Sequence, residues 1–265
     1  MSGVLRVNRL DERAQAGRRR RRGCSPLHPS TQEQDAAARL DRLAWICDTF
    51  GAVIGSEGGC SYFAPGIHVA EGMLTPVIGW GDADMKNRDS EYYVGGYYPP
   101  NGPRNFVQPV PLKEEYVRQH YDPRFLLPLN EVVFHDSFVS THHWGSSSLK
   151  FTNVSETAAL TEMLYQCPPL YHLNLDEFEK HHNRIMKHDA FFSPVHREIG
   201  FAAMTDFTWL TPDRLVQRTC FGDHVELIAN FGTALFEADG LSVPARTVVA
   251  RSLASGKLQI FTPSD

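Results

Sequence analysis

The feature that most constrains the fold is an amphipathic helix followed at once by a short apolar strand that glycines close. Between residues 24 and 51, apolar side chains recur at helical spacing on one face: Ala36, Leu40, Leu43, Cys47 and Phe50. Ser30 and Glu33 have the spacing of a capping box, and Gly51 is a typical helix stop. The segment AVIGSEGG follows directly, and a helix followed by a buried strand indicates an α/β layer.

Glu57 is the single carboxylate at the end of this strand, and glycines surround it. In α/β layers, and above all in (β/α)8 barrels, catalytic residues gather where strands end, because the loops there surround a common pocket. The structural alternative is a strand-end residue that caps a loop. The position makes Glu57 a candidate catalytic residue.

Composition and charge exclude several functional classes. The 265 residues carry a formal charge of −5 and a pI near 6.2, which does not favour binding to nucleic acid or to an anionic membrane. No apolar run approaches the ~18 residues of a membrane span, and the first residues do not show the basic, apolar and small-residue pattern typical of a signal peptide. The five cysteines are scattered, without a C-x-x-C pair, so neither a zinc ribbon nor a disulfide framework is indicated. We expect a cytoplasmic protein in a reducing compartment.

The first 23 residues differ in character from the rest. They contain a run of arginines from Arg18 to Arg22 but no aromatic residue and no helical periodicity. We interpret residues 1–23 as a solvated, disordered leader or the product of a wrongly placed start codon, and expect no regular strand there. The functional alternative is a nucleic-acid-binding or localisation patch.

The segment from Tyr62 to Pro128 is long, aromatic and rich in proline and glycine. Aromatic side chains such as Trp80 beside carboxylates and amides suit sugars, whose C–H faces stack on rings while their hydroxyls form hydrogen bonds. A folded excursion that only covers the domain is the alternative. The close aspartates Asp82, Asp84 and Asp89 could bind Ca²⁺, but they lack the glycine and the final glutamate of an EF-hand, so no motif supports a calcium site.

The segment from Asn130 to Val139 is β-branched and aromatic, which predicts a central strand. It carries His135 and Asp136 in its apolar middle. A buried carboxylate costs several kcal/mol unless it is paired or faces water, so this pair favours a functional site over a structural one. The histidines His142 and His143 and Trp144 follow. Zinc binding by His135, Asp136, His142 and His143 is an alternative, although the spacing matches no known zinc motif.

The C-terminal half of the sequence predicts two helices and then a β-rich part. Residues 156–166 predict a helix, with a short strand at PPLYHLN. Residues 174–192 predict a second helix capped by Asn174. Ser193 and Pro194 predict the start of a further helical segment, which would end at Gly200. Beyond a boundary near residues 200–211, the alternation predicts an antiparallel hairpin that turns at Gly222 and Asp223, with 214–220 paired to 224–230.

These segments together resemble glycoside hydrolase family 129. The motifs that carry the resemblance are GSEGG, GYYPPNGPRNFVQPVPLKE, YDPRFLLPLNEVVFHDSFVSTHHW, MLYQCPPLYHL and MTDFTWLTPDRLVQRTCFGDHVELIANFG. Their order is the specific part, and the similarity runs from about Cys24 to near the C-terminus. This family is related to the family 101 endo-α-N-acetylgalactosaminidases.

The resemblance implies a C-terminal part of a (β/α)8 barrel over residues 24–203 and a β-sandwich domain over residues 204–265. It also implies a retaining glycosidase that acts on α-linked N-acetylgalactosamine of O-glycans. We expect that no cofactor is required, and a bound Ca²⁺ stays an open alternative without a clear motif. Glu57 would be the general acid/base. His135, Asp136, His143, Trp144 and Trp80 would bind the sugar.

One departure from the family concerns the second carboxylate that a retaining enzyme needs. The resemblance implies an Asp a few dozen residues before Glu57, where this chain has Asp11 and Glu12 in the leader. Asp136 is the internal candidate, so we expect Glu57 and Asp136 to share a cleft with Trp144. We also expect a truncated enzyme that is a poor or inactive catalyst. The alternative is a non-catalytic carbohydrate-binding or interaction protein derived from a glycosidase barrel.

Overall fold

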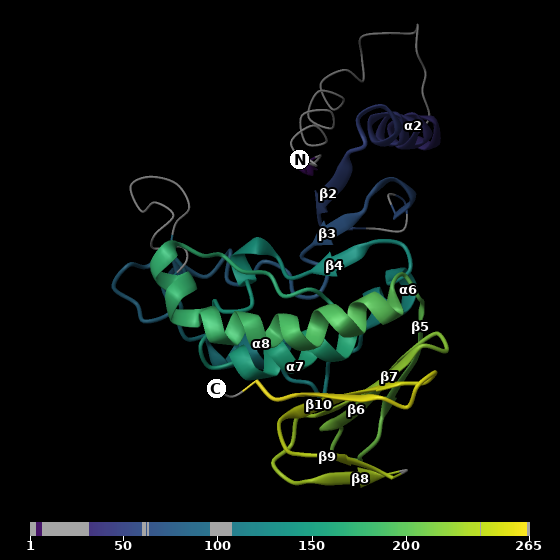
Figure 1. Cartoon of the computed structure of the whole chain (residues 1–265). Helices are drawn as coiled ribbons and strands as arrows, with labels where there is room; N and C mark the ends of the chain where they lie inside the picture. The colour runs from purple at the N-terminus through teal and green to yellow at the C-terminus, as the bar shows by residue number, and fades with distance from the viewer. Residues whose placement is uncertain are drawn as a thin grey trace, which may run out of the picture.

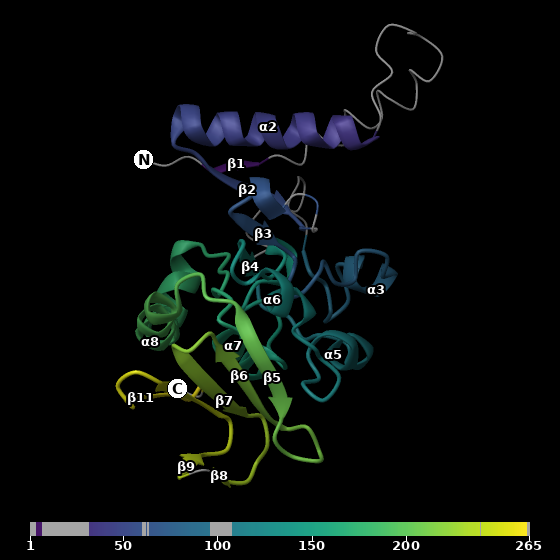
Figure 2. The ribbon, with the colours of Figure 1, turned by 90° about the vertical axis from the view of Figure 1, so that its right-hand side faces the viewer.

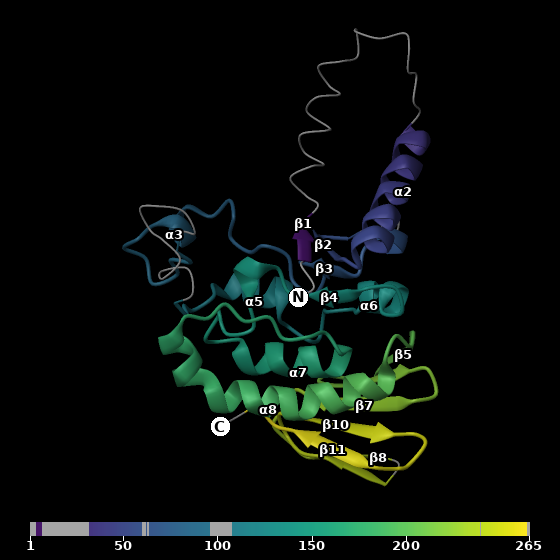
Figure 3. The ribbon, with the colours of Figure 1, turned by 45° about the horizontal axis from the view of Figure 1, so that its top comes forward.

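The computed structural model describes residues 4–6, 32–59, 62, 64–95, 108–238 and 240–263. The fold is mixed α/β and has three tiers (Figures 1 and 3). A parallel sheet lies at one end, the helices α7 (Ser155–Tyr165) and α8 (Leu175–Ile199) lie in the middle, and an antiparallel sheet lies beyond them. The two long helices therefore separate the two sheets.

The parallel sheet has the order β1-β2-β3-β4. Its strands are β1 (Val4–Arg6), β2 (Val53–Glu57), β3 (Val69–Glu71) and β4 (Val139–Thr141). Glu57 is in register with Glu71, and Glu71 with Thr141. Since four strands form this sheet in the part of the chain that the structure describes, a closed eight-stranded barrel stays a prediction.

Helix α2 (Gln32–Phe50) covers one face of this sheet, and Figure 2 shows it beside β1 and β2. Leu43 of α2 packs with Ile54 of β2 and Ala70 of β3 in one buried cluster. Gly51 ends the helix with a φ of +57°, a conformation that glycine adopts without a steric penalty. The predicted order of helix, glycine stop and strand is confirmed, whereas Ser30 of the predicted cap lies outside the described residues.

The expectation that the first 23 residues contribute no strand is wrong at Val4–Arg6. This segment forms β1 and pairs in parallel with β2, with Leu5 opposite Ile54. Three residues are too few to show a period, so the sequence pattern did not reveal the strand. The arginine run lies outside the described residues.

The strand predicted from Asn130 to Val139 is also wrong. Leu129–Phe134 form a short helix, α6, and the strand that follows, β4, starts at Val139. Val132 and Val133 of α6 are exposed, while Glu131 is buried, which is the reverse of what a central strand would require. The β-branched residues suggested a strand, but tertiary context overrode this weak propensity.

The two long helices confirm one prediction and correct two. In α8 the side chain of Asn174 accepts a hydrogen bond from the backbone N–H of Glu177 (2.8 Å), as the predicted cap requires. However, α8 continues through Pro194 to Ile199, because its apolar face is buried against the antiparallel sheet. The strand predicted at PPLYHLN does not form, and residues 168–174 have no regular structure. Pro168 and Pro169 lack the N–H groups that a strand donates.

The antiparallel sheet has the order β11-β10-β7-β6-β5. Its strands are β5 (Met204–Trp209), β6 (Val216–Phe221), β7 (Val225–Asn230), β10 (Thr247–Ser252) and β11 (Leu258–Phe261). The predicted hairpin is confirmed: β6 and β7 pair from Val216 opposite Asn230 to Phe221 opposite Val225. Gly222, with a φ of +53°, makes the turn.

The two faces of this sheet are covered differently. Helices α7 and α8 share a large apolar core with one face, where Leu160, Phe191 and Phe221 are buried. The hairpin of β8 (Phe236–Ala238) and β9 (Leu241–Val243) covers the other face through Val243 and Ile228. The C-terminal strands are therefore part of a helix-covered layer, and a separate β-sandwich is not confirmed.

The remaining elements are short. They are the 3-10 turns η1 (Ala64–Gly66) and η2 (Trp144–Ser146) and the helices α3 (Ala83–Lys86) and α5 (Glu114–His120). In the described residues, no helix is both long enough and apolar enough to cross a membrane.

Candidate active site

Glu57 lies at the carboxyl edge of the parallel sheet, on the face turned away from α2. Side chains alternate between the two faces of a strand. Ile54 packs toward α2 and has no exposed surface, so Gly55 and Glu57 belong to the opposite face. Glu57 is exposed and is the last residue of β2.

A second carboxylate, Glu71, stands beside Glu57 on the same face. The two residues are in register on the parallel strands β2 and β3, and Glu71 is also the last residue of its strand. Neighbouring strands are about 4.8 Å apart, and residues in register present their side chains to the same face. Glu71 is not among the site residues predicted from the sequence. The signal was present in the strand-ending Glu-Gly pair, which occurs at 57–58 and again at 71–72.

Glycines let the chain turn immediately after each carboxylate. Gly58 has a φ of +85° and Gly72 a φ of +80°, both in the left-handed region. The backbone N–H of Gly58 donates a hydrogen bond to the carbonyl of Glu71 (2.7 Å), which holds the two strand ends together. A side chain at Gly72 would meet the ring of His143 at 3.6 Å, so the imidazole lies close to the end of β3.

The end of β4 adds His143 and Trp144 to this edge. Nδ1 of His143 accepts a hydrogen bond from the backbone N–H of Gly145 (3.0 Å), so the neutral imidazole carries its proton on Nε2. The Trp144 ring lies 5.2 Å from the ring of His143 and 6.1 Å from that of His172. The carboxyl edge thus combines carboxylates, a hydrogen-bond donor and a half-buried indole.

His135 and Asp136 do not belong to this site. Both precede β4, so they lie at the amino edge of the parallel sheet, opposite to Glu57. Nδ1 of His135 is 2.8 Å from the carbonyl oxygen of Ala202, and burial lowers the pKa of the imidazole. Asp136 is exposed and accepts a hydrogen bond from Ser137 (3.1 Å). The expectation that Glu57 and Asp136 share a cleft is wrong, because residues 129–134 form helix α6 and β4 begins only at Val139, after Asp136.

The other predicted ligands have separate surroundings. Trp80 is 71% exposed, with the Lys86 amine 5.6 Å from its ring centre. Asp82 caps α3 and accepts hydrogen bonds from Lys113 at both oxygens (2.9 Å each), which lowers its pKa to about 2. Because Asp82 is already neutralised by a lysine, the calcium alternative gains no support. Among the described residues, no three histidine, cysteine or carboxylate side chains are grouped to hold a metal ion.

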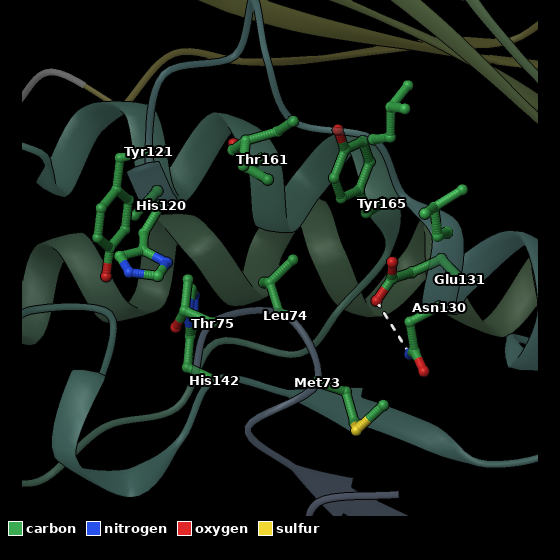
Figure 4. Close-up of a pocket in the computed structure, with 14 residues that line it drawn as sticks. Met73, Leu74, Thr75, His120, Tyr121, Asn130, Glu131, His142, Thr161 and Tyr165 are labelled. Carbon is green, nitrogen blue, oxygen red and sulfur yellow. Dashed lines mark hydrogen bonds between the residues drawn. The ribbon is translucent and has the colours of Figure 1, made fainter. Parts of the chain in front are cut away.

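A cavity of about 250 Å³ is lined by the segment after β3, by His142 after β4 and by side chains of α6 and α7 (Figure 4). The lining residues of the first segment are Met73, Leu74 and Thr75. Asn130 of α6 donates hydrogen bonds to Ser140 (2.6 Å) and to Glu131 (3.3 Å). Ser140 and Thr141 face opposite ways in β4, so α6 packs against the side of β4 that faces α2. Burial raises the pKa of Glu131, a residue that no sequence motif indicated.

The side chain of His142 points to the same side of the sheet as Ser140, so it cannot bind a zinc ion together with His143. Its Nε2 is 2.7 Å from Oε1 of Glu162, and its Nδ1 is 2.6 Å from the hydroxyl of Thr75. Both partners are buried. His142 and His143 therefore lie on opposite faces of the sheet, because successive side chains alternate along a strand.

The chain is similar to three solved structures of the α-N-acetylgalactosaminidase NagBb from Bifidobacterium bifidum. The quadruple mutant is 14% identical, with a TM-score of 0.44 over 89% of this chain and 27% of that one. The ligand-free structure is 14% identical, with a TM-score of 0.43 over 89% and 28%. The complex with GalNAc is 15% identical, with a TM-score of 0.42 over 83% and 28%. This chain therefore spans little more than a quarter of the length of those structures.

Two further comparisons use the sequence alone. No curated protein matches the chain. A family model described as glycosyl hydrolases related to family 101, family 129, matches residues 10–220, a range that includes both strand-end glutamates. This chain belongs to glycoside hydrolase family 129.

Proposed function

We propose that the carboxyl edge of the parallel sheet binds a terminal α-linked N-acetylgalactosamine of an O-glycan and hydrolyses its linkage with retention of configuration. Membership in a glycoside hydrolase family supports the reaction class. The name of the similar solved structures supports the choice of sugar. In this proposal the four parallel strands are part of a (β/α)8 barrel, and the C-terminal strands form the appended β domain.

The observation that carries the proposal is the placement of Glu57, His143 and Trp144 at one edge of the sheet. A galactose-type ring has an apolar C–H face that stacks on an indole such as Trp144. The Nε2–H of His143 can donate to a hydroxyl or to the acetamido carbonyl. This arrangement suits one sugar ring within reach of the Glu57 carboxyl.

Glu57 acts as the general acid/base. Its carboxyl group donates a proton to the glycosidic oxygen as the bond to the anomeric carbon breaks, and later its carboxylate takes a proton from the attacking water. Gly58, which follows at a φ of +85°, has no side chain to obstruct the approach of the sugar. Proton transfer of this kind contributes about 10²- to 10⁴-fold to the rate.

The test uses a panel of 4-nitrophenyl glycosides together with saturation-transfer NMR on the free sugars. We expect the α-N-acetylgalactosaminide to be turned over in preference to the α-N-acetylglucosaminide. We expect Glu57→Gln to lower kcat by about 10²- to 10⁴-fold while binding persists. Equal rates for both epimers, or an unaltered rate in Glu57→Gln, would contradict the proposal.

Carbohydrate binding without turnover is the second candidate function. The exposed position of Glu57 favours it, because general acid catalysts in glycosidases are typically partly buried. In that case saturation-transfer NMR detects N-acetylgalactosamine binding and Trp144→Ala abolishes it, while no nitrophenol is released.

A further inference from the structure

A buried carboxyl group faces the cavity that the segment after β3, His142 and the helices α6 and α7 line. Glu131 of α6 is 3% exposed, and Figure 4 shows its carboxyl group directed into the cavity, toward Leu74 and Tyr165. No lysine or arginine is among the described residues that line this cavity. The imidazole of His142 can carry a positive charge, but its Nε2 is already 2.7 Å from Glu162. Glu131 is therefore a buried acid without a dedicated counter-charge in the described part of the chain.

The hydrogen bonds of this carboxyl group engage one of its two oxygens. Oε1 accepts from Nδ2 of Asn130 (3.3 Å) and from Sγ of Cys167 (3.5 Å), and neither donor is a cation. No other described side chain donates to Oε2. An ionised carboxylate is costly to bury without a charged partner, so burial raises the pKa of Glu131. A ligand that brings a positive charge would remove this cost.

The cavity has room for a hydrocarbon group beside the carboxyl. Its volume is about 250 Å³, whereas an apolar cavity of about 150 Å³ already binds benzene. Its apolar lining consists of Met73, Leu74, Leu126, Leu127, Leu129 and Ala158. Leu127 and Leu129 are half or more exposed, so the cavity reaches the surface beside them. This lining suits a ligand with an apolar body and one cationic end.

We infer that this cavity binds a small primary amine, whose ammonium group pairs with the carboxylate of Glu131 while its hydrocarbon body packs among the leucines. An ammonium has three N–H donors, and Oε2 of Glu131 and the hydroxyl of Tyr165 are acceptors of the kind it needs. The amine site does not depend on the proposed sugar site, since neither Glu57 nor the pair His143 and Trp144 lines the cavity.

Isothermal titration calorimetry of the whole chain with benzylamine and with benzyl alcohol tests this site. The two probes have nearly the same shape, but only the amine is cationic at neutral pH. We expect the amine to bind about 10- to 100-fold more tightly, as a hydrogen bond between charged groups implies. Glu131→Gln should remove this preference, because the amide keeps the shape of the carboxyl group without its charge. Glu156→Gln, at an exposed position of α7, is the matched control and should bind both probes like the wild type.

The affinity for benzylamine should also fall as the pH is lowered. A proton and the ammonium compete for one carboxylate, and the raised pKa of Glu131 moves this competition toward neutral pH. The other titratable groups at the cavity are Tyr121, Tyr165, Cys167, His120 and His142, with Glu162 behind His142. Burial raises the pKa of both tyrosines and of the thiol, so these three stay neutral. The histidines repel the ammonium in both proteins when they are protonated, so the difference between the wild type and Glu131→Gln isolates the carboxylate.

Three results would overturn the amine site. Equal affinities of the wild type for the amine and the alcohol would show that the cavity selects by shape alone. Benzylamine binding that is unchanged in Glu131→Gln would place the amine elsewhere. Binding of neither probe would show that the cavity holds no such ligand. The first comparison needs only the wild type, so it decides the matter even if Glu131→Gln fails to fold. Hydrolysis of the nitrophenyl glycosides tests the proposed function separately.

Discussion

At the scale of single residues, the buried polar side chains set how this protein responds to pH. His188 of α8 is 1% exposed, and its Nδ1 is 2.6 Å from the hydroxyl of Tyr171. Its ring packs against Phe261 of β11, 5.3 Å away. Burial lowers the pKa of this imidazole to about 4.

We expect His188 to make the fold sensitive to acid. In the unfolded chain its pKa is about 6.5, so between that value and about 4 the unfolded state binds a proton that the folded state does not. The free energy of unfolding therefore falls as the pH drops through this window, by up to about 3 kcal/mol. Urea titrations at neutral pH and near pH 4 should show a smaller loss in His188→Gln than in the wild type. Equal losses would contradict this role.

Lys150 is a buried cation that joins two distant parts of the chain. Its Nζ donates hydrogen bonds to the carbonyl oxygens of Val94 and Gln108, each at 2.8 Å. Burial lowers the pKa of the amine to about 8.

Lys150→Met should be destabilising because the carbonyl oxygens of Val94 and Gln108 lose the hydrogen bonds that the buried amine donates. A hydrogen bond from a charged group contributes about 1.5–3 kcal/mol. Lys257→Met, at an exposed position between β10 and β11, is the matched control and should change stability by less than about 0.5 kcal/mol. Chemical denaturation of both variants measures the difference, and similar values for the two would show that the hydrogen bonds of Lys150 contribute little.

At the scale of elements, the ends of the parallel strands are defined by glycine. Gly58 and Gly81 both have open space where a side chain would be added, but only Gly58 has a positive φ, at +85°. The two positions therefore differ in backbone conformation rather than in packing.

Gly58→Ala should cost about 1–2 kcal/mol of stability, the penalty of a left-handed conformation for an L-residue. Gly81→Ala should be neutral or slightly stabilising, because alanine reduces the entropy of the unfolded chain. Thermal melts of the two variants provide the comparison. If both variants melt alike, the turn after Glu57 can adopt a backbone that alanine tolerates.

At the scale of the whole molecule, the C-terminal sheet and the two long helices share one core. Leu160 and Leu164 of α7 are fully buried against Phe221, Leu227 and other side chains of the sheet. The hydroxyl of Thr219 also donates to the carbonyl of Leu164 (2.7 Å). A boundary drawn at residues 203–204 therefore cuts through a continuous apolar interior.

We expect these two parts to unfold together. Leu164→Ala should cost about 2–5 kcal/mol, and one transition should appear both by far-UV circular dichroism and by tryptophan fluorescence. Leu253→Ala, at an exposed position after β10, is the control and should melt like the wild type. A sheet that melted separately from the helices would contradict the shared core.

The sequence by itself determined the elements whose signals are local. Helix α2 with its glycine stop, the strand that ends in Glu57, the Asn174 cap and the β6–β7 hairpin all follow from periodicity, capping and turn residues within a short stretch. The order of the motifs also indicated the family. These features depend on neighbours in the chain, which the sequence displays directly.

Only the tertiary structure decided which residues meet. The apolar stretch around Val132 and Val133 resembles a strand in the sequence, but in the structure it is helix α6. In this helix Glu131 is buried and the two valines are exposed. That change moved Asp136 to the amino edge of the sheet. Glu71 became the neighbour of Glu57 through strand pairing between residues 14 positions apart, a register that no local pattern specifies. The candidate site is therefore a product of sheet topology, since carboxylates approach one another only after the strands have paired.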